Sequence, residues 1–305
     1  MTKILFVKTS SLGDVVHNCP AVSDAARALP STAIDWVVEE AFAAIARMHG
    51  SVRRVIPVAV RRWCSSLWKP EVWREIGAWK RELAAERYDA VVDTQSLLKS
   101  ALIARAARGR RHGLDGASSR EWPAAWLYDV RHSVPRGLHA VERNRSLTAA
   151  ALGFSPQKQL EYGLRVPGAE KSGYVVFLTM TSRADKLWPE ERWIELARGM
   201  RAPTILPWGN DEERNRAQRI ADATGGTVLP RKNLDELAKM LVAARAVVGL
   251  DTGLTHLAAA LGVKTIGLYC ASDPALTGIH GAPRAHNVGA RGRAPEVVEV
   301  LRLLE

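Results

Sequence analysis

Short apolar runs alternate with longer amphipathic segments along the whole chain. Runs of this kind, rich in β-branched side chains, are typical of buried parallel strands. In the first half of the sequence they occupy residues 4–7, 34–38, 54–58 and 90–93. In the second half they occupy residues 174–178, 204–206, 227–229, 246–250 and 264–268.

Segments with helical spacing lie between these runs. The longest covers residues 71–87, and the others cover residues 21–29, 189–200, 212–223, 234–244, 254–261 and 295–304. Strands that alternate with helices predict an α/β fold with parallel sheets. Because a stretch with Gly, Pro and polar residues at 162–173 separates the two arrays, we predict two doubly wound, Rossmann-like domains that face each other across a central cleft.

The composition is that of an ordinary globular protein. Hydrophobic residues make up 47% and charged residues 25% of the 305 residues, which excludes a disordered chain. Stretches without charge, such as residues 252–263, are too short to cross a bilayer, and residues 1–7 lack the apolar core of a signal peptide. The three cysteines are widely spaced, which argues against disulfides or a zinc site. We therefore expect a protein of the reducing cytoplasm.

The net charge of +11 is concentrated in the first half of the chain. Residues 1–160 carry 24 basic and 15 acidic side chains, a net charge of +9. This excess predicts an anionic partner: nucleic acid, a phosphorylated substrate or a membrane surface. The basic positions are Arg61, Arg62, Lys99, residues 105–111, Arg120 and residues 143–145, and Trp63, Trp68, Trp73 and Trp79 interleave with some of them. Such residues fit a lipid surface, nucleic acid or ordinary solvated helix faces, and charge alone does not choose among them.

Candidate chemistry lies in the loops that follow the predicted strands, where open α/β sheets bind their ligands. Asp14 follows Gly13 at the start of a helix, after residues 8–12. Its carboxylate could be a general base or could merely cap the helix, and spacing alone favours the cap. The loop has neither the P-loop pattern nor GxGxxG, so the hypothesis of a nicotinamide or flavin enzyme loses its main support.

Three loops in the second half could bind a nucleotide. The amides of Thr252 and Gly253 at a helix start could hold a pyrophosphate, or Asp251 could cap that helix with His256 in the core. Residues 179–189 offer hydroxyl groups and Lys186 for a phosphate, or form a solvated loop. Residues 206–213 end in acidic side chains that suit a ribose or simply an exposed helical turn. Since the chain has no DxD or HExxH metal motif, amides, a lysine and a helix dipole would stabilise an anionic leaving group.

These segments, taken together and in order, resemble one family over almost the whole chain. The matching segments are residues 8–14, 35–40, 55–63, 88–93, 139–143, 185–191, 206–209 and 251–256. They resemble the lipopolysaccharide heptosyltransferases of glycosyltransferase family 9, and most closely those that add the first heptose. The nearest alternative is a family member that adds the second heptose or another sugar. A basic nucleic-acid-binding protein is the alternative from a different class, although no nucleic-acid motif is recognisable.

The resemblance implies a GT-B fold, an α/β architecture with an acceptor-binding domain at residues 1–165 and an ADP-sugar-binding domain at residues 166–290. Residues 291–305 are expected to return to the N-terminal domain as a helix. The implied activity is the inverting, metal-independent transfer of L-glycero-D-manno-heptose from its ADP-β-linked donor, ADP-heptose, to Kdo₂-lipid A. No cofactor and no nucleic acid is implied. The implied location is the anionic inner leaflet, with the protein peripheral on the cytoplasmic face of the inner membrane.

The resemblance also assigns roles to single residues. It reverses the preference for a capping role of Asp14, because Asp14 matches the family's catalytic base. It assigns Lys186 to catalysis as well. The positions matched to the donor are Thr181, Ser182, Lys186, Glu213, Asp251, Thr252, Gly253 and His256. The positions matched to the acceptor are Lys8, Ser10, Arg61, Arg62, Lys99, Arg120 and Arg143. The chain departs from the family at Thr179 and Leu187, where histidine is usual.

Overall fold

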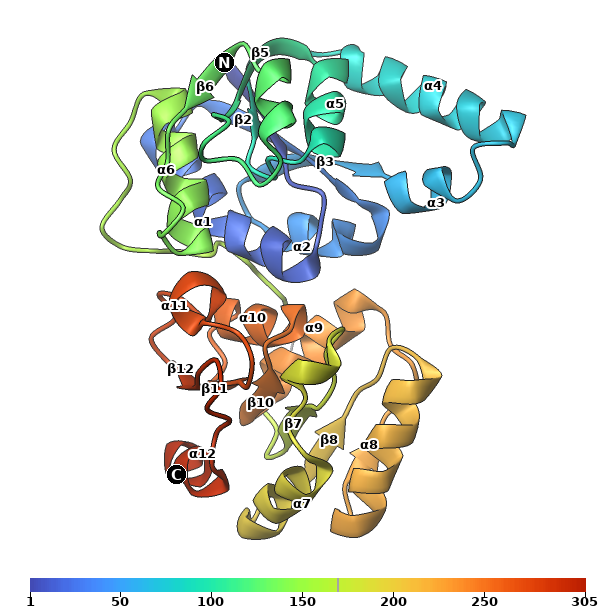
Figure 1. Ribbon diagram of the computed structural model, residues 1–305, viewed down its shortest axis with the longest axis vertical. Coiled ribbons are helices and arrows are strands. Elements are labelled where there is room, and N and C mark those ends of the chain that lie inside the picture. The colour runs from blue at the N-terminus through green and yellow to red at the C-terminus, as the bar shows by residue number, and fades with distance from the viewer. Residues whose placement is uncertain (169) are drawn as a thin grey trace. The chain divides into compact units, whose positions relative to one another are not determined.

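The computed structural model describes residues 1–168 and 170–305, which divide into two compact units (Figure 1). The N-terminal unit is Met1–Leu164 and the C-terminal unit is Arg165–Glu305. The division lies one residue before the boundary that the sequence predicts. Each unit contains one six-stranded parallel sheet.

The N-terminal sheet has the strand order β3-β2-β1-β4-β5-β6. Its strands are β1 (Thr2–Val7), β2 (Thr32–Glu39), β3 (Val52–Val58), β4 (Arg87–Asp93), β5 (Arg108–Leu114) and β6 (Val130–His132). The helices are α1 (Leu12–Ala28), α2 (Ala43–Met48), α3 (Val60–Cys64), α4 (Pro70–Ala84), α5 (Leu98–Ala106) and α6 (Ala140–Leu152), with the short 3₁₀ turns η1 (Glu40–Phe42) and η2 (Trp122–Leu127). β1 is a central strand of this sheet. Its side chains Ile4 and Val7 are fully buried, as expected for a parallel sheet with helices on both faces.

The apolar pattern did not predict β5 and β6. β5 carries Arg108, Arg110 and Arg111, so the basic stretch at residues 105–111 is in part a strand and not only a surface segment. An ion pair supports the pairing of β5 with β6, because Arg111 of β5 contacts Asp129, the residue before β6, at 2.6 Å. A polar strand near the edge of a sheet does not need the continuous apolar run that identifies a central strand.

The C-terminal sheet has the order β12-β11-β10-β7-β8-β9. Its strands are β7 (Val175–Leu178), β8 (Thr204–Leu206), β9 (Thr227–Val228), β10 (Ala246–Leu250), β11 (Thr265–Tyr269) and β12 (Ala285–Gly289). The helices are α7 (Glu190–Gly199), α8 (Asp211–Thr224), α9 (Leu234–Ala243), α10 (Gly253–Ala260), α11 (Pro274–Thr277) and α12 (Val297–Leu304), with the 3₁₀ turn η3 (Ala184–Lys186). β12 is the strand that the apolar pattern missed, because His286 and Asn287 expose its middle.

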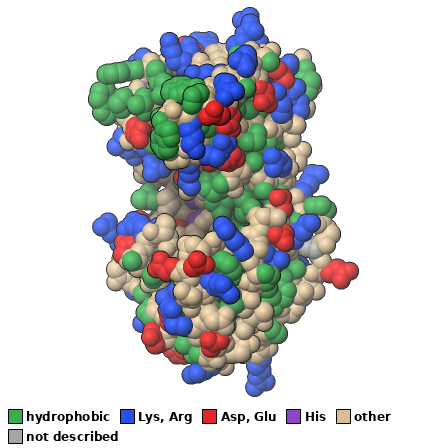
Figure 2. Space-filling model, turned by 90° about the vertical axis from the view of Figure 1, so that its right-hand side faces the viewer, with side chains coloured by type: hydrophobic (Ala, Val, Ile, Leu, Met, Phe, Trp, Pro, Cys, Tyr) green, Lys and Arg blue, Asp and Glu red, His purple; other side chains and the backbone are tan. Residues whose placement is uncertain are grey.

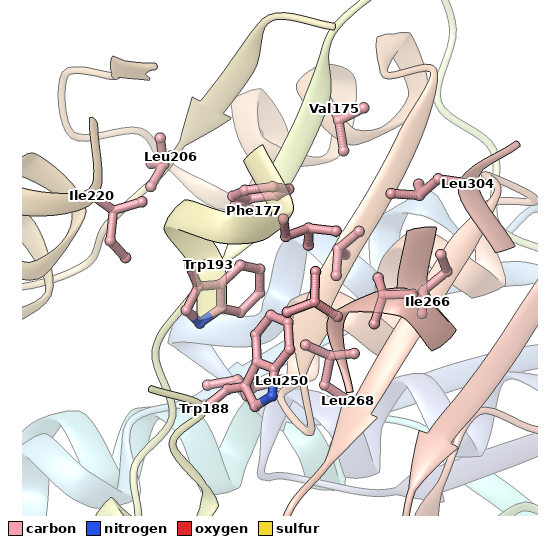
Figure 3. Packing of buried hydrophobic residues seen from close by; sticks show 14 of the residues in the cluster. Val175, Phe177, Trp188, Trp193, Leu206, Ile220, Leu250, Ile266, Leu268 and Leu304 are labelled. Carbon is pink, nitrogen blue, oxygen red and sulfur yellow. The ribbon is translucent and has the colours of Figure 1, made fainter. Parts of the chain in front are cut away.

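Aromatic side chains fill the core between this sheet and α7. Trp188 and Trp193 are fully buried and meet edge to face, with ring centroids 5.1 Å apart (Figure 3). Phe177 of β7 packs on Trp193 at 4.9 Å. The indole nitrogen of Trp188 also donates to the main-chain oxygen of Pro295 at 2.9 Å. Trp188 thereby anchors the segment that carries Lys186 to the core of the unit.

The last helix, α12, packs on α7 and β12 within the C-terminal unit. The physical reason is its apolar stripe: Val297, Val300 and Leu304 are buried in the same core as Trp193. Lys264 further ties the helix end to the sheet by donating to the main-chain oxygen of Leu304 at 2.9 Å. The expected return of α12 to the N-terminal domain stays a prediction.

Both sheets have the strand order 3-2-1-4-5-6 when numbered within their own unit. The order reverses between β1 and β4 in the first sheet and between β7 and β10 in the second. At such a switch point the loops after the two strands diverge to opposite faces of the sheet. The loop after β1 therefore lies beside residues 94–97, and residues 179–187 lie beside residues 251–256. Within the described part of the chain, no helix combines the length and apolar character that crossing a bilayer requires.

A buried ion pair joins the C-terminal half of α1 to α6. The Nε of Arg145 donates to Asp24 at 2.6 Å, and the two side chains are 5% and 0% exposed. Arg27 contacts the other carboxylate oxygen of Asp24 at 2.8 Å. The buried carboxylate of Asp24 depends on these two cations, because an unpaired charge in the interior has lost its water at a large cost in free energy.

The Arg145→Met variant is therefore expected to destabilise the N-terminal unit by about 2 to 4 kcal/mol, since Arg27 compensates part of the loss. Urea unfolding followed by circular dichroism measures this change. Arg74→Met is the control, because Arg74 pairs with Glu71 on the surface and should change stability by less than about 0.5 kcal/mol. A loss below about 1 kcal/mol for Arg145→Met would show that the pair is not a structural tie.

Candidate functional site

Lys8 is a buried cation at the switch point of the N-terminal sheet. It follows β1 and is 5% exposed. Its Nζ donates to the main-chain oxygen of Thr94 at 2.8 Å and to Oδ1 of Asn144 in α6 at 3.4 Å. Burial lowers the pKa of Lys8, while the charges of Asp14 and Asp93 raise it. Lys8 is thus held by neutral oxygen atoms and lies within electrostatic reach of two carboxylates.

Gln95 fastens the loops after β1 and β4 to each other. Its Oε1 accepts from the amides of Thr9 and Ser10 at 3.1 and 3.2 Å. Ser10, predicted as an acceptor contact, is buried at 7% exposure. The backbone before α1 is therefore fixed in one arrangement, and the first turn of the helix starts from a rigid base.

Asp14 lies in the first turn of α1 as the third residue after the cap. Ser11 occupies the cap position, and its amide and hydroxyl donate to Oδ2 of Asp14 at 3.0 and 3.2 Å. The sequence suggested Asp14 as the N-cap residue, whereas the structure makes Ser11 the N-cap and Asp14 the third helical residue, which completes a capping box. However, both hydrogen bonds end on Oδ2, and Oδ1 accepts none from the described residues. The half-buried carboxylate can cap the helix with one oxygen and accept a proton with the other.

Two arginines reach the loop after β5. Arg143 of α6 donates from Nη2 to the main-chain oxygen of Ser118, and Arg136 donates in the same way to Ser119, both at 2.6 Å. Arg120 follows these serines directly in the chain. The Nε of Arg143 is buried and has no hydrogen-bond partner within residues 1–168 and 170–305. The loop therefore gathers guanidinium groups and retains a donor for a further acceptor.

The charges of these three arginines and Lys8 act on one another. Burial lowers the pKa of Arg143, and the neighbouring charges of Arg136 and Arg120 lower it further. Arg120 and Arg143 likewise oppose protonation of Lys8. We call Lys8, Arg120, Arg136 and Arg143 the basic cluster. Because a bound anion relieves this repulsion, the basic cluster suits a ligand with carboxylate or phosphate groups.

Arg136 is the member that the sequence analysis missed. It lies between Pro135 and Gly137, in the loop after β6. Because β6 was not predicted, that loop was not recognised as the carboxyl end of a strand. An arginine between a proline and a glycine was the available signal, since such residues form the turns that carry binding side chains.

The other predicted acceptor residues lie outside these contacts. Arg62 of α3 is exposed and forms ion pairs with Glu40 at 3.2 Å and with Glu75 at 2.7 Å. The guanidinium of Arg61 lies 5.5 Å from the centre of the Phe42 ring. Lys99 is exposed on α5. Their assignment to the acceptor stays a prediction, and Arg62 would have to leave two carboxylates to fulfil it.

Asp251 collects three donors at the switch point of the C-terminal sheet. Its Oδ2 accepts from Lys186 Nζ at 2.6 Å and from Ser272 Oγ at 2.7 Å. Its Oδ1 lies 3.3 Å from Nε2 of the buried His256. Burial alone would raise the pKa of Asp251, but hydrogen bonds from His256, Lys186 and Ser272 lower it below the usual range. The ionised carboxylate therefore fixes the position of the Lys186 ammonium group.

α10 begins beside this ammonium group. Thr252, and not Asp251, is its cap residue, and Gly253 is the first helical residue. The amides at the start of a helix carry partial positive charge and point out of the helix. Thr255 donates to the main-chain oxygen of Leu250 at 2.6 Å, and a Cβ at Gly249 would lie 2.3 Å from Thr255 Oγ1. Close helix–strand packing thus fixes the amides and the Lys186 cation as two positive groups at one place.

The remaining predicted donor positions lie after the neighbouring strands β7 and β8. Thr181 is half-buried and Ser182 exposed, both between β7 and η3. Glu213 is in the first turn of α8, where its Oε2 accepts from the amide of Gly209 at 2.7 Å. Its side chain therefore caps the loop after β8, which agrees with the simpler interpretation of this acidic turn.

The two positions that depart from the family have ordinary structural roles. Thr179 is 2% exposed directly after β7, and Leu187 packs against the core around Trp188. A histidine at either place would need polar partners. The described residues contain no group of three or more His, Cys, Asp or Glu side chains that could hold a metal ion.

Comparison with known proteins gives consistent matches over the chain. The model of glycosyltransferase family 9 (heptosyltransferase) matches residues 76–304. Lipopolysaccharide heptosyltransferase 1 of Escherichia coli strain K12 is 43% identical over 312 residues, covering 96% of this chain and 97% of that protein. The structure of the E. coli heptosyltransferase WaaC with ADP has a TM-score of 0.92 and 40% identity, covering 99% of both chains. The structure of WaaC with ADP-2-deoxy-2-fluoro heptose has a TM-score of 0.87 and 39% identity, with 99% of both chains covered. These matches confirm the predicted α/β fold of the GT-B class.

Proposed function

The chain belongs to glycosyltransferase family 9, the heptosyltransferases, and from this premise we propose that it transfers L-glycero-D-manno-heptose from ADP-heptose to a Kdo residue of Kdo₂-lipid A. The relative from E. coli K12 is named lipopolysaccharide heptosyltransferase 1 and is matched over 97% of its length. Solved structures of the similar WaaC hold ADP and a fluorinated ADP-heptose. The single observation that supports the donor site most strongly is the Lys186 ammonium group held beside the start of α10.

In this proposal the C-terminal unit binds the donor. Lys186 and the amides of Thr252 and Gly253 contact the diphosphate, because a point charge and a helix start both stabilise phosphate oxygens. The hydroxyl groups of Thr181 and Ser182 add hydrogen bonds. Asp251 keeps Lys186 in position at 2.6 Å and does not itself need to contact the phosphates.

The sugar and ribose contacts complete the donor site in this proposal. His256, whose Nε2 lies 3.3 Å from Oδ1 of Asp251, lines the sugar site in this proposal. Oε1 of Glu213, the oxygen that does not bind the Gly209 amide, accepts a hydrogen bond from a ribose hydroxyl. Little rearrangement is needed, because the hydrogen bond that Oε1 accepts from Asn210 is 3.2 Å long.

The N-terminal unit binds the acceptor in this proposal. Kdo carries a carboxylate and lipid A carries phosphates, and these groups fit the basic cluster. Ser10 lies between Lys8 and the start of α1. Arg61, Arg62 and Lys99 are exposed cations that we assign to the acceptor as well, and Arg62 would have to leave Glu40 and Glu75 to reach it. The acceptor is a membrane lipid, so we infer that the protein acts as a peripheral protein at the anionic inner leaflet. The net charge of +9 over residues 1–160 supports this location.

The reaction that we propose is a single in-line displacement without a metal. The acceptor hydroxyl attacks the anomeric carbon while Oδ1 of Asp14 takes its proton. The bond between that carbon and the β-phosphate oxygen breaks at the same time, and ADP leaves with the bonding electron pair. Lys186 and the start of α10 stabilise the charge that develops on the β-phosphate. The configuration at the anomeric carbon is thereby inverted.

The substitution Asp14→Asn separates the two roles of this side chain. The amide oxygen can still accept from Ser11 and keep the helix cap, but the group can no longer take a proton. We expect turnover to fall about a hundred-fold or more, the contribution of a positioned base, while the affinity for ADP stays unchanged. Steady-state kinetics and calorimetry measure the two quantities. Turnover within a few-fold of the wild type would exclude Asp14 as the base.

Replacing Lys186 by Ala should weaken ADP binding about ten- to a hundred-fold, the range for a charge-assisted hydrogen bond, and should also slow turnover. Calorimetric titration with ADP measures the change. Arg183→Ala is the matched control, since Arg183 is exposed in the same loop and pairs with Asp185. Unchanged ADP affinity in Lys186→Ala, or an equal loss in the control, would remove Lys186 from the donor site.

The function itself is tested by incubating the protein with ADP-heptose and Kdo₂-lipid A. Mass spectrometry of the lipid should show the addition of one heptose. A parallel incubation with the acceptor that already carries one heptose distinguishes the second transfer. Product from the heptosylated acceptor alone would assign the chain to the second step, and no product from either would refute heptose transfer to this lipid.

A further inference from the structure

Large hydrophobic side chains are exposed on two neighbouring elements of the N-terminal unit. On α5, Leu98 and Leu102 are 42% and 55% exposed. On η2, Trp122 and Trp126 are 58% and 66% exposed, and their rings meet edge to face at 4.8 Å. Figure 2 shows hydrophobic side chains gathered on the surface of this unit, with Lys and Arg side chains beside them. Side chains of this size are not left in water without a cost.

The two elements form one continuous surface, which we call the α5–η2 face. α5 packs against η2, with Ala101, Ala124 and Tyr128 buried between them. The amide of Leu98 donates to Glu121 Oε2 at 2.7 Å, which fixes the start of α5 to the start of η2. Leu98 and Leu102 are four residues apart and therefore point to the same side of the helix. The exposed leucines and tryptophans are thus held rigidly on one face.

Cations border the α5–η2 face. Lys99 and Arg105 are exposed on α5, and Arg120 is exposed two residues before the start of η2. The nearby carboxylate of Glu121 is occupied by the amide of Leu98. Tryptophans flanked by Lys and Arg are the combination that favours an anionic bilayer surface, because indole rings partition to the headgroup level and cations attract the lipid charge.

The face is also continuous with the acceptor site. Leu98 begins the helix that follows the loop of Thr94 and Gln95, which holds Lys8 and Ser10. The amide of Glu121 donates to the main-chain oxygen of Ser96 at 3.4 Å. Arg120 belongs to the basic cluster and to the border of the face. A lipid acceptor can therefore keep its acyl chains in the bilayer while its charged sugars reach the basic cluster.

A second exposed apolar group near α4 fits a membrane less well. Trp68 and Trp73 are 75% and 59% exposed. The indole of Trp73 already donates to the main-chain oxygen of Leu67 at 2.7 Å. Its neighbours Glu71 and Glu75 neutralise the arginines beside them through ion pairs of 3.0 and 2.7 Å. Two of the arginines near this group are therefore paired with carboxylates, and its tryptophans provide the comparison for the α5–η2 face.

We propose that the α5–η2 face docks the protein on a bilayer that contains anionic lipid, with Trp122 and Trp126 at the headgroup level and Lys99, Arg105 and Arg120 on the lipid charges. The proposal rests on the proposed function only for the statement that docking brings the acceptor to the basic cluster. Binding to vesicles without any substrate is independent of it.

Sedimentation with phosphatidylcholine vesicles, with or without phosphatidylglycerol, tests the proposal. The wild type should bind the anionic vesicles, and added salt should weaken the binding. The double variant Trp122→Ser/Trp126→Ser should bind about ten-fold more weakly or worse, and Leu98→Ser/Leu102→Ser should weaken binding in the same direction. Trp68→Ser/Trp73→Ser should stay within about two-fold of the wild type. Circular dichroism confirms that each variant is folded.

Three outcomes would overturn the proposal: no binding by the wild type, wild-type binding by both double variants of the face, or a larger loss in the Trp68/Trp73 control. Heptose transfer separates this proposal from the proposed function. Trp122→Ser/Trp126→Ser should keep turnover on a water-soluble Kdo acceptor and lose it on vesicle-embedded acceptor. If the wild type uses neither acceptor, the proposed function fails, while the sedimentation result still decides whether the face docks.

Discussion

The reversal of strand order at the centre of each sheet is the constraint on which the candidate site depends. Where neighbouring parallel strands send their connections to opposite faces, their carboxyl ends are left for binding loops. Each unit places one lysine there, Lys8 after β1 and Lys186 before α7. A buried lysine keeps its charge only if fixed oxygen atoms replace the water that it loses. The loops at both switch points are consequently organised around these ammonium groups.

The two lysines differ in what surrounds them, and the difference matches the proposed division of work. Lys186 contacts a carboxylate, Asp251, so its charge is partly balanced before a ligand binds. Lys8 contacts neutral oxygens and is repelled by arginines, so the basic cluster retains excess positive charge. A diphosphate leaving group needs a fixed, preorganised cation. A lipid acceptor with several negative groups needs a broader positive surface, and in the proposed docking the α5–η2 face continues that surface toward the bilayer.

The sequence was sufficient to predict those features that depend on short, local patterns of residues. The central strands were predictable because burial on both faces demands continuous apolar runs, whereas β5 and β12 carry polar side chains near the sheet edges. Arg136 could not be recognised, because its position depends on the unpredicted β6. The capping and catalytic interpretations of Asp14 could not be separated by spacing, since one carboxylate has two oxygens and the structure uses only Oδ2 for the cap. The apolar stripe of α12 fits a core in either unit, so its contacts with α7 and β12 could not be predicted from the pattern.

In the proposed mechanism one carboxylate is the base and separate cations stabilise the departing phosphate, so that the sugar is transferred in a single displacement. The most direct test is the anomeric configuration of the heptose in the product, read from the coupling between its anomeric carbon and hydrogen by nuclear magnetic resonance. A donor with the β configuration should give an α-linked product. A β-linked product would contradict the account, because retention requires a second displacement or a nucleophile that the proposed mechanism does not include.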